Sequence, residues 1–374
     1  MKNRYKSIAF CIATMSLSFI ACGPQNDLLP WEIIDESQNG GESGGGISGG
    51  DVSLEVMEGE MLSGLAYILN YDTHKYQYLR ANSIDVFSGY FMVPHSVFEY
   101  GKPLLHTYDF PNGYYSGPLG ESPRLYPYIY HAFFYGEKHG VPEWKALAEI
   151  AYAYSAQELT DFYGPIPYDD YRARKETPPL TYLSSKEVYE RIFTDLDDAI
   201  AILNKAQPSA EQLKKVEGPN GGFSDGDWKN WVKFANSLRL RMALNMVKAD
   251  PVKAQAIAES AVNDPIGVFK YGDKGFIMTM KDSPQHPHYQ LGHDWNDIRL
   301  GASLENILKK YNSPLLKKWF TTNNGPIEAN GVQTLGVGQD YAGIRQGTGV
   351  APHNAPKGYK AFSTFTDKYM PRSY

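Results

Sequence analysis

Aromatic side chains stand next to polar ones in two segments of the sequence, and together they could bind a ligand. The chain contains 28 Tyr, 17 Phe and 6 Trp among 374 residues. A sugar presents flat C–H faces with a rim of hydroxyl groups, so a sugar-binding site needs exposed rings beside hydrogen-bonding side chains. The candidates in residues 276–300 are Tyr289, Asp294, Trp295, Asn296 and Arg299, and those in residues 108–130 include Tyr114 and Tyr115. Trp295 is the first choice, and the alternative is that each ring packs beneath a long loop.

Histidines in the first of these segments are a second group that could do chemistry. A His-x-His-x4-His pattern followed by an aspartate supplies ligand types that zinc accepts: His286, His288, His293 and Asp294. Pro284 and Pro287 predict an irregular loop here, which would not present the ligands together on a helix face. We therefore expect a polar loop without a metal ion, and we expect no cofactor.

Paired carboxylates are the minimum for a glycosidase, which holds two of them about 5 to 10 Å apart. Two groups qualify by type: Asp169 with Asp170, and Asp195 with Asp197 and Asp198. The second group falls on a predicted helix whose opposite face is apolar, so we expect it to be solvated. Arg239 and Arg241 are expected to pair with carboxylates or helix ends. The sequence thus favours a protein that is not an enzyme, with a surface-anchored glycoside hydrolase as the alternative.

Helical periodicity predicts the elements that carry these residues. Apolar residues recur at spacings of three and four in residues 143–162, 184–203, 227–246 and 250–263, and further helices are expected at 303–310 and within 54–70. Ser184 and Glu187 form a capping box, and Asp227 and Asp250 are suitable N-caps. Strand signals are scarce, and residues 325–356 indicate an irregular surface segment. The predicted fold is mainly α, with tetratricopeptide-like helix hairpins and long, irregular, aromatic-rich loops.

The N-terminus predicts export and acylation. A positively charged start precedes an uncharged apolar run over residues 8–21, which is too short to span a bilayer but suits an export signal. Phe-Ile-Ala-Cys at residues 19–22 resembles a bacterial lipobox, so residues 1–21 are the expected signal peptide and Cys22 the expected acylated residue. Cys11, the one other cysteine, would be removed with the signal. An ordinary signal peptide or a short membrane anchor is the alternative.

Composition divides the rest of the chain into a tether and a body. Residues 22–50 are rich in glycine near their end and too flexible to pack, whereas residues 51–374 have enough apolar content for a large core. The formal net charge is −6, which argues against a nucleic-acid partner. We therefore expect one helical binding domain on a flexible tether.

Several segments of this body carry motifs of a known family. The longest spans residues 151–168 and ends Leu-Thr-Asp-Phe-Tyr-Gly-Pro-Ile-Pro-Tyr, in which Gly-Pro-Ile-Pro should end the helix and begin an extended loop. The similarity continues in residues 188–200 and 231–241, and in residues 76–82 with Tyr90 and Phe91. Over about residues 54–311, the chain resembles the SusD/RagB-like nutrient-binding outer-membrane lipoproteins of Bacteroidetes, in the branch called SusD-like.

The resemblance implies a function without covalent chemistry. Such proteins are lipid-anchored to the outer membrane and face the cell exterior, where they capture oligosaccharides, or sometimes peptides, for a SusC-like TonB-dependent transporter. Members usually continue beyond the equivalent of Tyr374 through another helix pair, so we expect a C-terminally shortened chain. A non-binding structural helical-repeat protein is a further alternative. The family's ligand contacts vary, so its motifs assign no site residue here.

Overall fold

The structure of the protein is a computed structural model. It describes residues 50–69, 76–94, 126–175, 179–218, 223–273, 287–329, 332–347 and 361–366. The chain divides into two units, residues 1–51 and 52–374, and every element named below belongs to the second. The predicted signal peptide, Cys22 and most of the predicted tether lie outside the described residues, as do Tyr114 and Tyr115.

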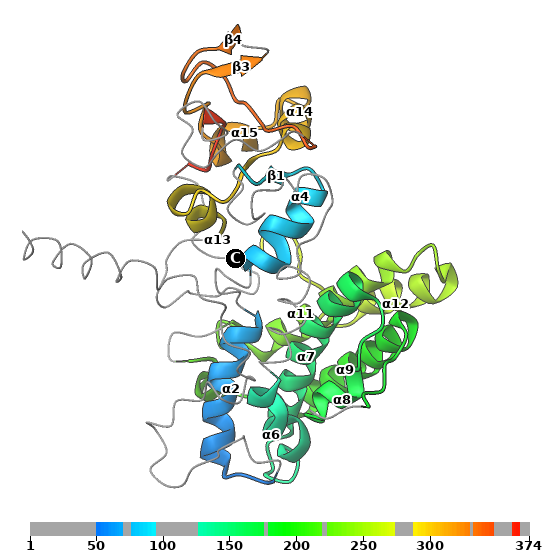
Figure 1. The fold of residues 1–374 in the computed structure, drawn as a ribbon. Helices are drawn as coiled ribbons and strands as arrows, with labels where there is room; N and C mark the ends of the chain where they lie inside the picture. Colours follow the sequence, from blue (N-terminus) through cyan, green and yellow to red (C-terminus); the bar gives the residue numbers. More distant parts are fainter. Residues whose placement is uncertain are drawn as a thin grey trace, which may run out of the picture. The chain divides into compact units, whose positions relative to one another are not determined.

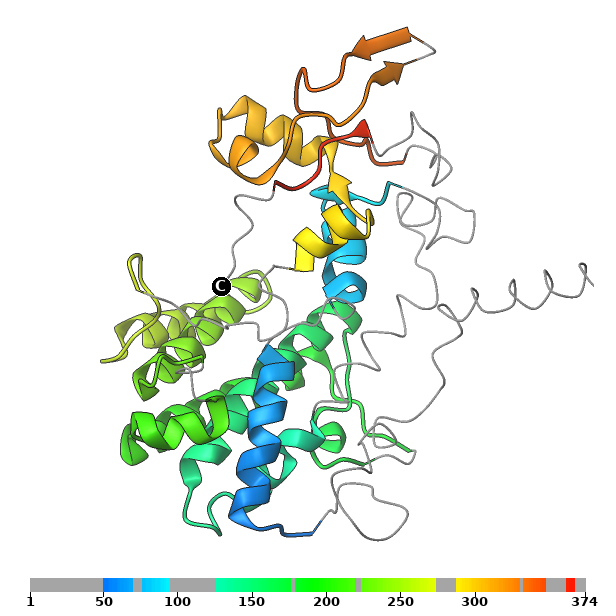
Figure 2. The ribbon, with the colours of Figure 1, turned by 90° about the vertical axis from the view of Figure 1, so that its left-hand side faces the viewer.

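Helices dominate the described part of the body. Those around the larger apolar core are, in chain order, α2 (Leu54–Leu69), α6 (Pro127–Tyr135), α7 (Pro142–Tyr163), α8 (Tyr168–Arg172), α9 (Ser185–Ala206), α10 (Ala210–Glu217), α11 (Trp228–Asn245) and α12 (Pro251–Asn263). Helix α7 packs against α2, α6 and α9, and α11 packs against α9 and α12 (Figure 1). The turned view shows α2, in blue, running beside α6 and α7 (Figure 2). This arrangement confirms the predicted mainly α fold.

Local sequence signals set the ends of these helices. Ser184 accepts a hydrogen bond from the backbone N–H of Glu187, whose carboxylate accepts from the N–H of Ser184, so the predicted capping box of α9 is confirmed. A second capping box, between Ser209 and Gln212, begins α10, which the sequence analysis did not identify. Helix α6 was also not predicted, because it overlaps the end of the expected aromatic loop.

No helix of the described residues is long and apolar enough to cross a membrane.

Helix α7 forms the centre of the larger apolar core. Most of its residues are buried, among them Trp144, Leu147 and Tyr152. Helix α9 faces it with the stripe that the sequence predicts, in which Ile192 and Leu196 are fully buried. Burial of each such side chain contributes about 1.5–3 kcal/mol, so the α7–α9 contact is a main source of stability.

The segment that follows α7 differs from its prediction. Gly164 ends the helix in a backbone conformation with φ +81°, which strongly favours glycine. Ile166 then pairs with Leu183 in an isolated bridge, but the chain returns to helix at Tyr168. The predicted extended loop was therefore wrong beyond Pro167, and the short helix α8 takes its place.

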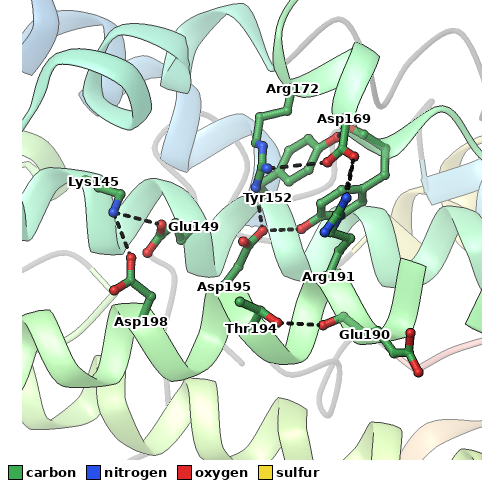
Figure 3. Close-up of polar contacts among 11 residues, drawn as sticks. Lys145, Glu149, Tyr152, Asp169, Arg172, Glu190, Arg191, Thr194, Asp195 and Asp198 are labelled. Atoms are coloured by element: carbon green, nitrogen blue, oxygen red, sulfur yellow. Dashed lines mark hydrogen bonds and ion pairs between the residues drawn. The ribbon is translucent and has the colours of Figure 1, made fainter. Parts of the chain in front are cut away.

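Polar side chains join α7, α8 and α9 beneath this turn (Figure 3). Asp195 of α9 is largely buried, where it accepts hydrogen bonds from the Tyr168 hydroxyl and, at 2.7 Å, from Arg172. The prediction that Asp195 lies on a solvated face was wrong, because these two donors from α8 compensate the burial of its charge. Burial still raises the pKa of Asp195 above its ordinary value, and Arg172 opposes that shift.

Glu149 is a buried carboxyl on α7 that the sequence analysis did not single out. Lys145 Nζ lies 3.5 Å from its Oε1 and 2.7 Å from Asp198 Oδ2, so one ammonium group serves both carboxyls (Figure 3). The second oxygen, Oε2, is buried and has no hydrogen-bond partner among the described residues. Burial raises the pKa of Glu149 to about 8, which Lys145 opposes. Near neutral pH this side chain is therefore mostly uncharged.

A second, smaller apolar cluster holds the remaining elements together. It includes Phe91, Leu291, Ile298, Phe320 and Phe365. The elements that carry its residues or adjoin them are the π-helix η3 (Gln77–Ile84), α4 (Asp85–Phe87), β1 (Phe91–Met92), α13 (Pro287–Tyr289), the π-helix η7 (Gln290–Asp294), β2 (Arg299–Leu300), α14 (Ala302–Lys310) and α15 (Leu315–Trp319). Strands β1 and β2 pair antiparallel, with Phe91 opposite Leu300. The segment predicted to be irregular contains a short antiparallel hairpin, β3 (Ile327–Ala329) with β4 (Val332–Leu335).

The α7–α9 contact predicts the cost of a core truncation. Leu196→Ala removes a fully buried side chain, so the free energy of unfolding should fall by about 2–5 kcal/mol. Leu244→Ala, which truncates a side chain that is 62% exposed on α11, should cost less than about 0.5 kcal/mol. Denaturant unfolding of the two variants measures the difference, and equal losses would contradict the packing described here.

Glu149 predicts a pH-dependent effect on stability. Because its pKa rises from 4.5 to about 8 on folding, the wild-type protein loses stability as the pH increases through this interval. Glu149→Gln abolishes that loss, so the unfolding free energy of the variant relative to wild type should increase by about 2–4 kcal/mol between roughly pH 5 and pH 9. Glu137→Gln changes the exposed partner of the same lysine and should show no such trend. A pH-independent difference for Glu149→Gln would disprove the shift.

Candidate ligand-binding site

The predicted ligand residues of the 276–300 segment lie on a helical turn and in the chain directly after it. Pro287 begins α13, which continues directly into the π-helix η7, so the prediction of an irregular loop was wrong for the described residues. Proline is tolerated at the first helical position because no helical partner awaits its nitrogen. Trp295 is the C-cap of η7, and its N–H donates to the carbonyl of Gln290 at 2.9 Å. π-helical turns occur frequently at functional sites.

Asn296 reverses the chain after this turn. Its φ is +62°, in the left-handed region, which asparagine enters more readily than most residues. The N–H of Asp297 then donates to the carbonyl of Leu291 at 2.7 Å and closes the end of the helix. The chain proceeds from there into β2. Asn296 is therefore favoured by the backbone of this turn, whether or not it contacts a ligand.

Arg299 is buried beneath the same turn. One terminal nitrogen, Nη1, donates to the carbonyls of Gly292 at 2.6 Å and Ile298 at 2.9 Å, and the other donates to the side-chain oxygen of Asn296. Burial lowers the pKa of Arg299 to about 10. A guanidinium with these internal acceptors positions the turn, and its direct contact with a ligand stays a prediction.

The exposed rim of the turn consists of His293, Asp294 and part of Trp295. Tyr289 is buried and stacks on the ring of His293, with ring centroids 4.7 Å apart and an interplanar angle of 14°. His293 Nδ1 lies 2.9 Å from Asp294 Oδ1, and the two side chains are 44% and 47% exposed. Trp295 is half-buried and packs against the smaller apolar cluster. The structure thus brings an aromatic surface and an exposed carboxylate together.

His293 was not among the predicted ligand residues. Residues at positions i and i+4 of a helix face the same side, so a helical prediction for this segment would have placed His293 over Tyr289. The loop prediction hid this relation. Tyr114 and Tyr115, the other predicted ligand residues, lie outside the described residues.

Residues far away in the sequence hold the turn in place. Gln77 of η3 donates to Asp297 Oδ2 at 2.5 Å, and both side chains are buried. His288 Nε2 lies 3.0 Å from Asp85 Oδ2, and the His288 ring stacks on Phe365 with an interplanar angle of 8°. Polar contacts therefore fix the turn on both sides of η7.

The described residues contain no group of three or more histidine, cysteine, aspartate or glutamate side chains that could hold a metal ion. His288 and His293 belong to separate pairs, with Asp85 and Asp294 respectively. His286, the third member of the predicted pattern, lies outside the described residues.

The aspartates that were considered for acid–base chemistry all take part in internal contacts. Asp169 lies 3.4 Å from Arg172 and 3.3 Å from Arg191 (Figure 3). Asp170 accepts from the N–H of Thr181 at 2.6 Å, which lowers its pKa. The remaining pairs are Asp195 with Arg172, Asp197 with Arg239 at 2.9 Å, and Asp198 with Lys145. The expectation that Arg239 pairs with a carboxylate is confirmed.

Comparisons with known proteins identify the family. The family model described as "SusD-like: Susd and RagB outer membrane lipoprotein" matches residues 54–370. The sequence has no match among curated proteins.

Solved structures share the fold. A chitin-binding SusD homologue from Flavobacterium johnsoniae is 24% identical, with a TM-score of 0.65 over 85% of this chain and 62% of that one. A SusD-like protein from Bacteroides thetaiotaomicron is 26% identical, with a TM-score of 0.67 over 85% and 61%. A SusD homologue from Bacteroides ovatus is 22% identical, with a TM-score of 0.69 over 86% and 62%. The matched part is thus about three fifths of the length of these relatives. Because the family model matches most of the sequence, the chain belongs to the SusD-like family of SusD and RagB outer-membrane lipoproteins.

Proposed function

We propose that this protein is a cell-surface binding protein that captures a glycan and passes it to a SusC-like, TonB-dependent outer-membrane transporter. The observation that carries the proposal is the family match over residues 54–370. A relative with the same fold is described as chitin-binding, which supports a glycan as the class of ligand. An oligopeptide is the other ligand class to be tested.

In this proposal the ligand stacks on the exposed part of Trp295. A sugar's C–H face would lie against the indole, while the carboxylate of Asp294 accepts hydrogen bonds from neighbouring hydroxyl groups. Arg299 donates to the side-chain oxygen of Asn296 and so holds the backbone directly after Trp295. The aspartates considered for acid–base chemistry all form ion pairs or hydrogen bonds within the protein, and this supports binding without hydrolysis. They are Asp169, Asp170, Asp195, Asp197 and Asp198.

Anchoring would follow from the N-terminus. Acyl chains on Cys22 would hold the protein on the outer membrane, facing the exterior, without a spanning helix. A glycine-rich coil of the predicted tether's length spans roughly 30 Å, enough to let the body reach both ligand and transporter.

Trp295→Ala tests the proposed platform. Loss of the stacking surface should weaken glycan binding about 10-fold or more, because one central aromatic residue commonly carries about 2 kcal/mol of an interface. Titration calorimetry with chitooligosaccharides, followed by a wider glycan array, measures the affinity. Trp319→Ala is the matched control, since Trp319 is also half-buried against the same apolar cluster but lies on α15. Its affinity should equal that of wild type.

Two other results would count against the proposal. Wild-type protein that binds neither glycan nor peptide, although it is folded, would contradict capture. Release of reducing sugar from a bound glycan by pure protein would instead indicate a hydrolase. Thermal unfolding of each variant shows whether a lost affinity merely reports a lost fold.

A further inference from the structure

A second group of polar and aromatic side chains lies where α7, α9 and α11 meet. Tyr189 of α9 donates its hydroxyl hydrogen to Asp161 Oδ1 at 2.6 Å, and Asn245 Nδ2 of α11 lies 3.4 Å from Asp161 Oδ2. The amide of Gln157 connects Asp161 to Arg241, because it donates to the carboxylate and accepts from the guanidinium. All of these residues except Asn245 belong to the three longest segments of family resemblance, and the Trp295 site uses none of them.

Arg241 differs from four other arginines of the body, which form ion pairs. Arg80, Arg172, Arg191 and Arg239 each lie within 4 Å of a carboxylate. Among the described residues Arg241 has no such partner, and its one hydrogen bond runs from Nη2 to Gln157. Its guanidinium carbon lies 5.7 Å from the ring centre of Tyr154. The expectation that Arg241 pairs with a carboxylate or helix end was therefore wrong, and its Nε and Nη1 atoms donate no hydrogen bond to a described residue.

Neighbouring charges act on Arg241 in both directions. Burial lowers the pKa of Arg241, and the positive charge of Arg80, which is paired with Glu158, lowers it further. The carboxylate of Asp161 opposes this shift but is already shared among three hydrogen-bond donors. A carboxylate that arrived with a ligand would form charge-assisted bonds with the guanidinium edge in the planar geometry that arginine favours.

The side-chain oxygen of Asn245 is a hydrogen-bond acceptor beside the guanidinium of Arg241. It follows Arg241 by four residues on α11, so the two side chains lie on the same helix face with Cβ atoms about 5–6 Å apart. Asn245 is exposed, and its side-chain oxygen accepts no hydrogen bond from a described residue. An amide oxygen in this position can accept from a hydroxyl group next to the bound carboxylate. The half-buried ring of Tyr154 supplies an apolar surface close by.

We propose that Arg241, Asn245 and Tyr154 form a binding site for a uronic acid unit of an acidic polysaccharide. The guanidinium would hold the sugar carboxylate, the amide oxygen would accept from a neighbouring hydroxyl, and the tyrosine ring would contact the sugar's C–H face. The inference rests on the proposed function in that the ligand is a glycan. It goes further because it assigns a second site and an acidic substrate class.

Binding of uronate polymers tests this site. The probes are polygalacturonate and its methyl ester, which differ in the charged carboxylate, and titration calorimetry of the full mature chain gives the affinities. Wild-type protein should bind the acid at least about 10-fold more tightly than the ester, as expected for hydrogen bonds to a charged group. Arg241→Ala should weaken binding of the acid by about 10- to 100-fold, and Arg241→Lys should restore only part of it, because an ammonium lacks the planar fork.

Matched variants separate this effect from a loss of charge or of fold. Asn245→Asp introduces a carboxylate that competes for Arg241 and repels the ligand, so it should weaken binding at least as much as Arg241→Ala. Arg191→Ala removes the same charge from another exposed arginine, on α9, and should leave the affinity unchanged. Thermal unfolding midpoints of Arg241→Ala and Arg241→Lys should stay within a few degrees of wild type.

The outcomes distinguish this inference from the proposed function. Wild-type protein that binds neutral chitooligosaccharides but shows no preference for the acid, or an Arg241→Ala variant with unchanged affinity, would overturn the uronate site alone. Binding of poly-glutamate that equals that of polygalacturonate would also overturn it, in favour of an acidic peptide. Failure to bind any glycan would overturn the proposed function as well.

Discussion

The contacts of one guanidinium hold four helices together. Arg172 of α8 donates to the buried carboxylate of Asp195 on α9, and it lies 4.4 Å from the ring centre of Phe133 on α6. Tyr168 shares the same carboxylate, while its backbone carbonyl accepts from Tyr152 of α7 at 2.5 Å. A buried Asp195 without these donors would carry the full desolvation cost of its charge. The packing of α6 to α9 therefore depends on the short helix that supplies Arg172 and Tyr168.

Helices with one clear apolar stripe could be predicted from the sequence, and the others could not. In α9 and α12 the observed bounds agree closely with the periodicity and the N-caps. Helix α6 is aromatic on almost every side, so it has little periodicity to detect. The burial of Asp195 also escaped prediction, because it is decided by partners 23 and 27 residues away. Local pattern reveals which residues prefer a helix, whereas the burial of a charge depends on what another helix brings to it.

The candidate site, too, could be predicted from the sequence only in part. The residue types around Trp295 could be identified from the sequence because rings and hydrogen-bonding groups alternate there. The π-helical turn could not, since it depends on distant anchors such as Gln77 and the His288–Asp85 pair. Those anchors decide that Tyr289 is buried and that His293 and Asp294 form the exposed rim.

Two arginines show why residue type alone does not identify a ligand contact. Arg299 has internal acceptors for both terminal nitrogens, so breaking them to bind a ligand would cost hydrogen bonds that are already made. Arg241 has one internal acceptor, and its remaining donors form no hydrogen bond with a described residue. A ligand anion would add bonds to Arg241 without breaking the one that Arg241 makes within the protein. Arg241 is therefore the better candidate for recognising a charged ligand, because more of its N–H groups lack an acceptor among the described residues. Only a three-dimensional structure can show this difference.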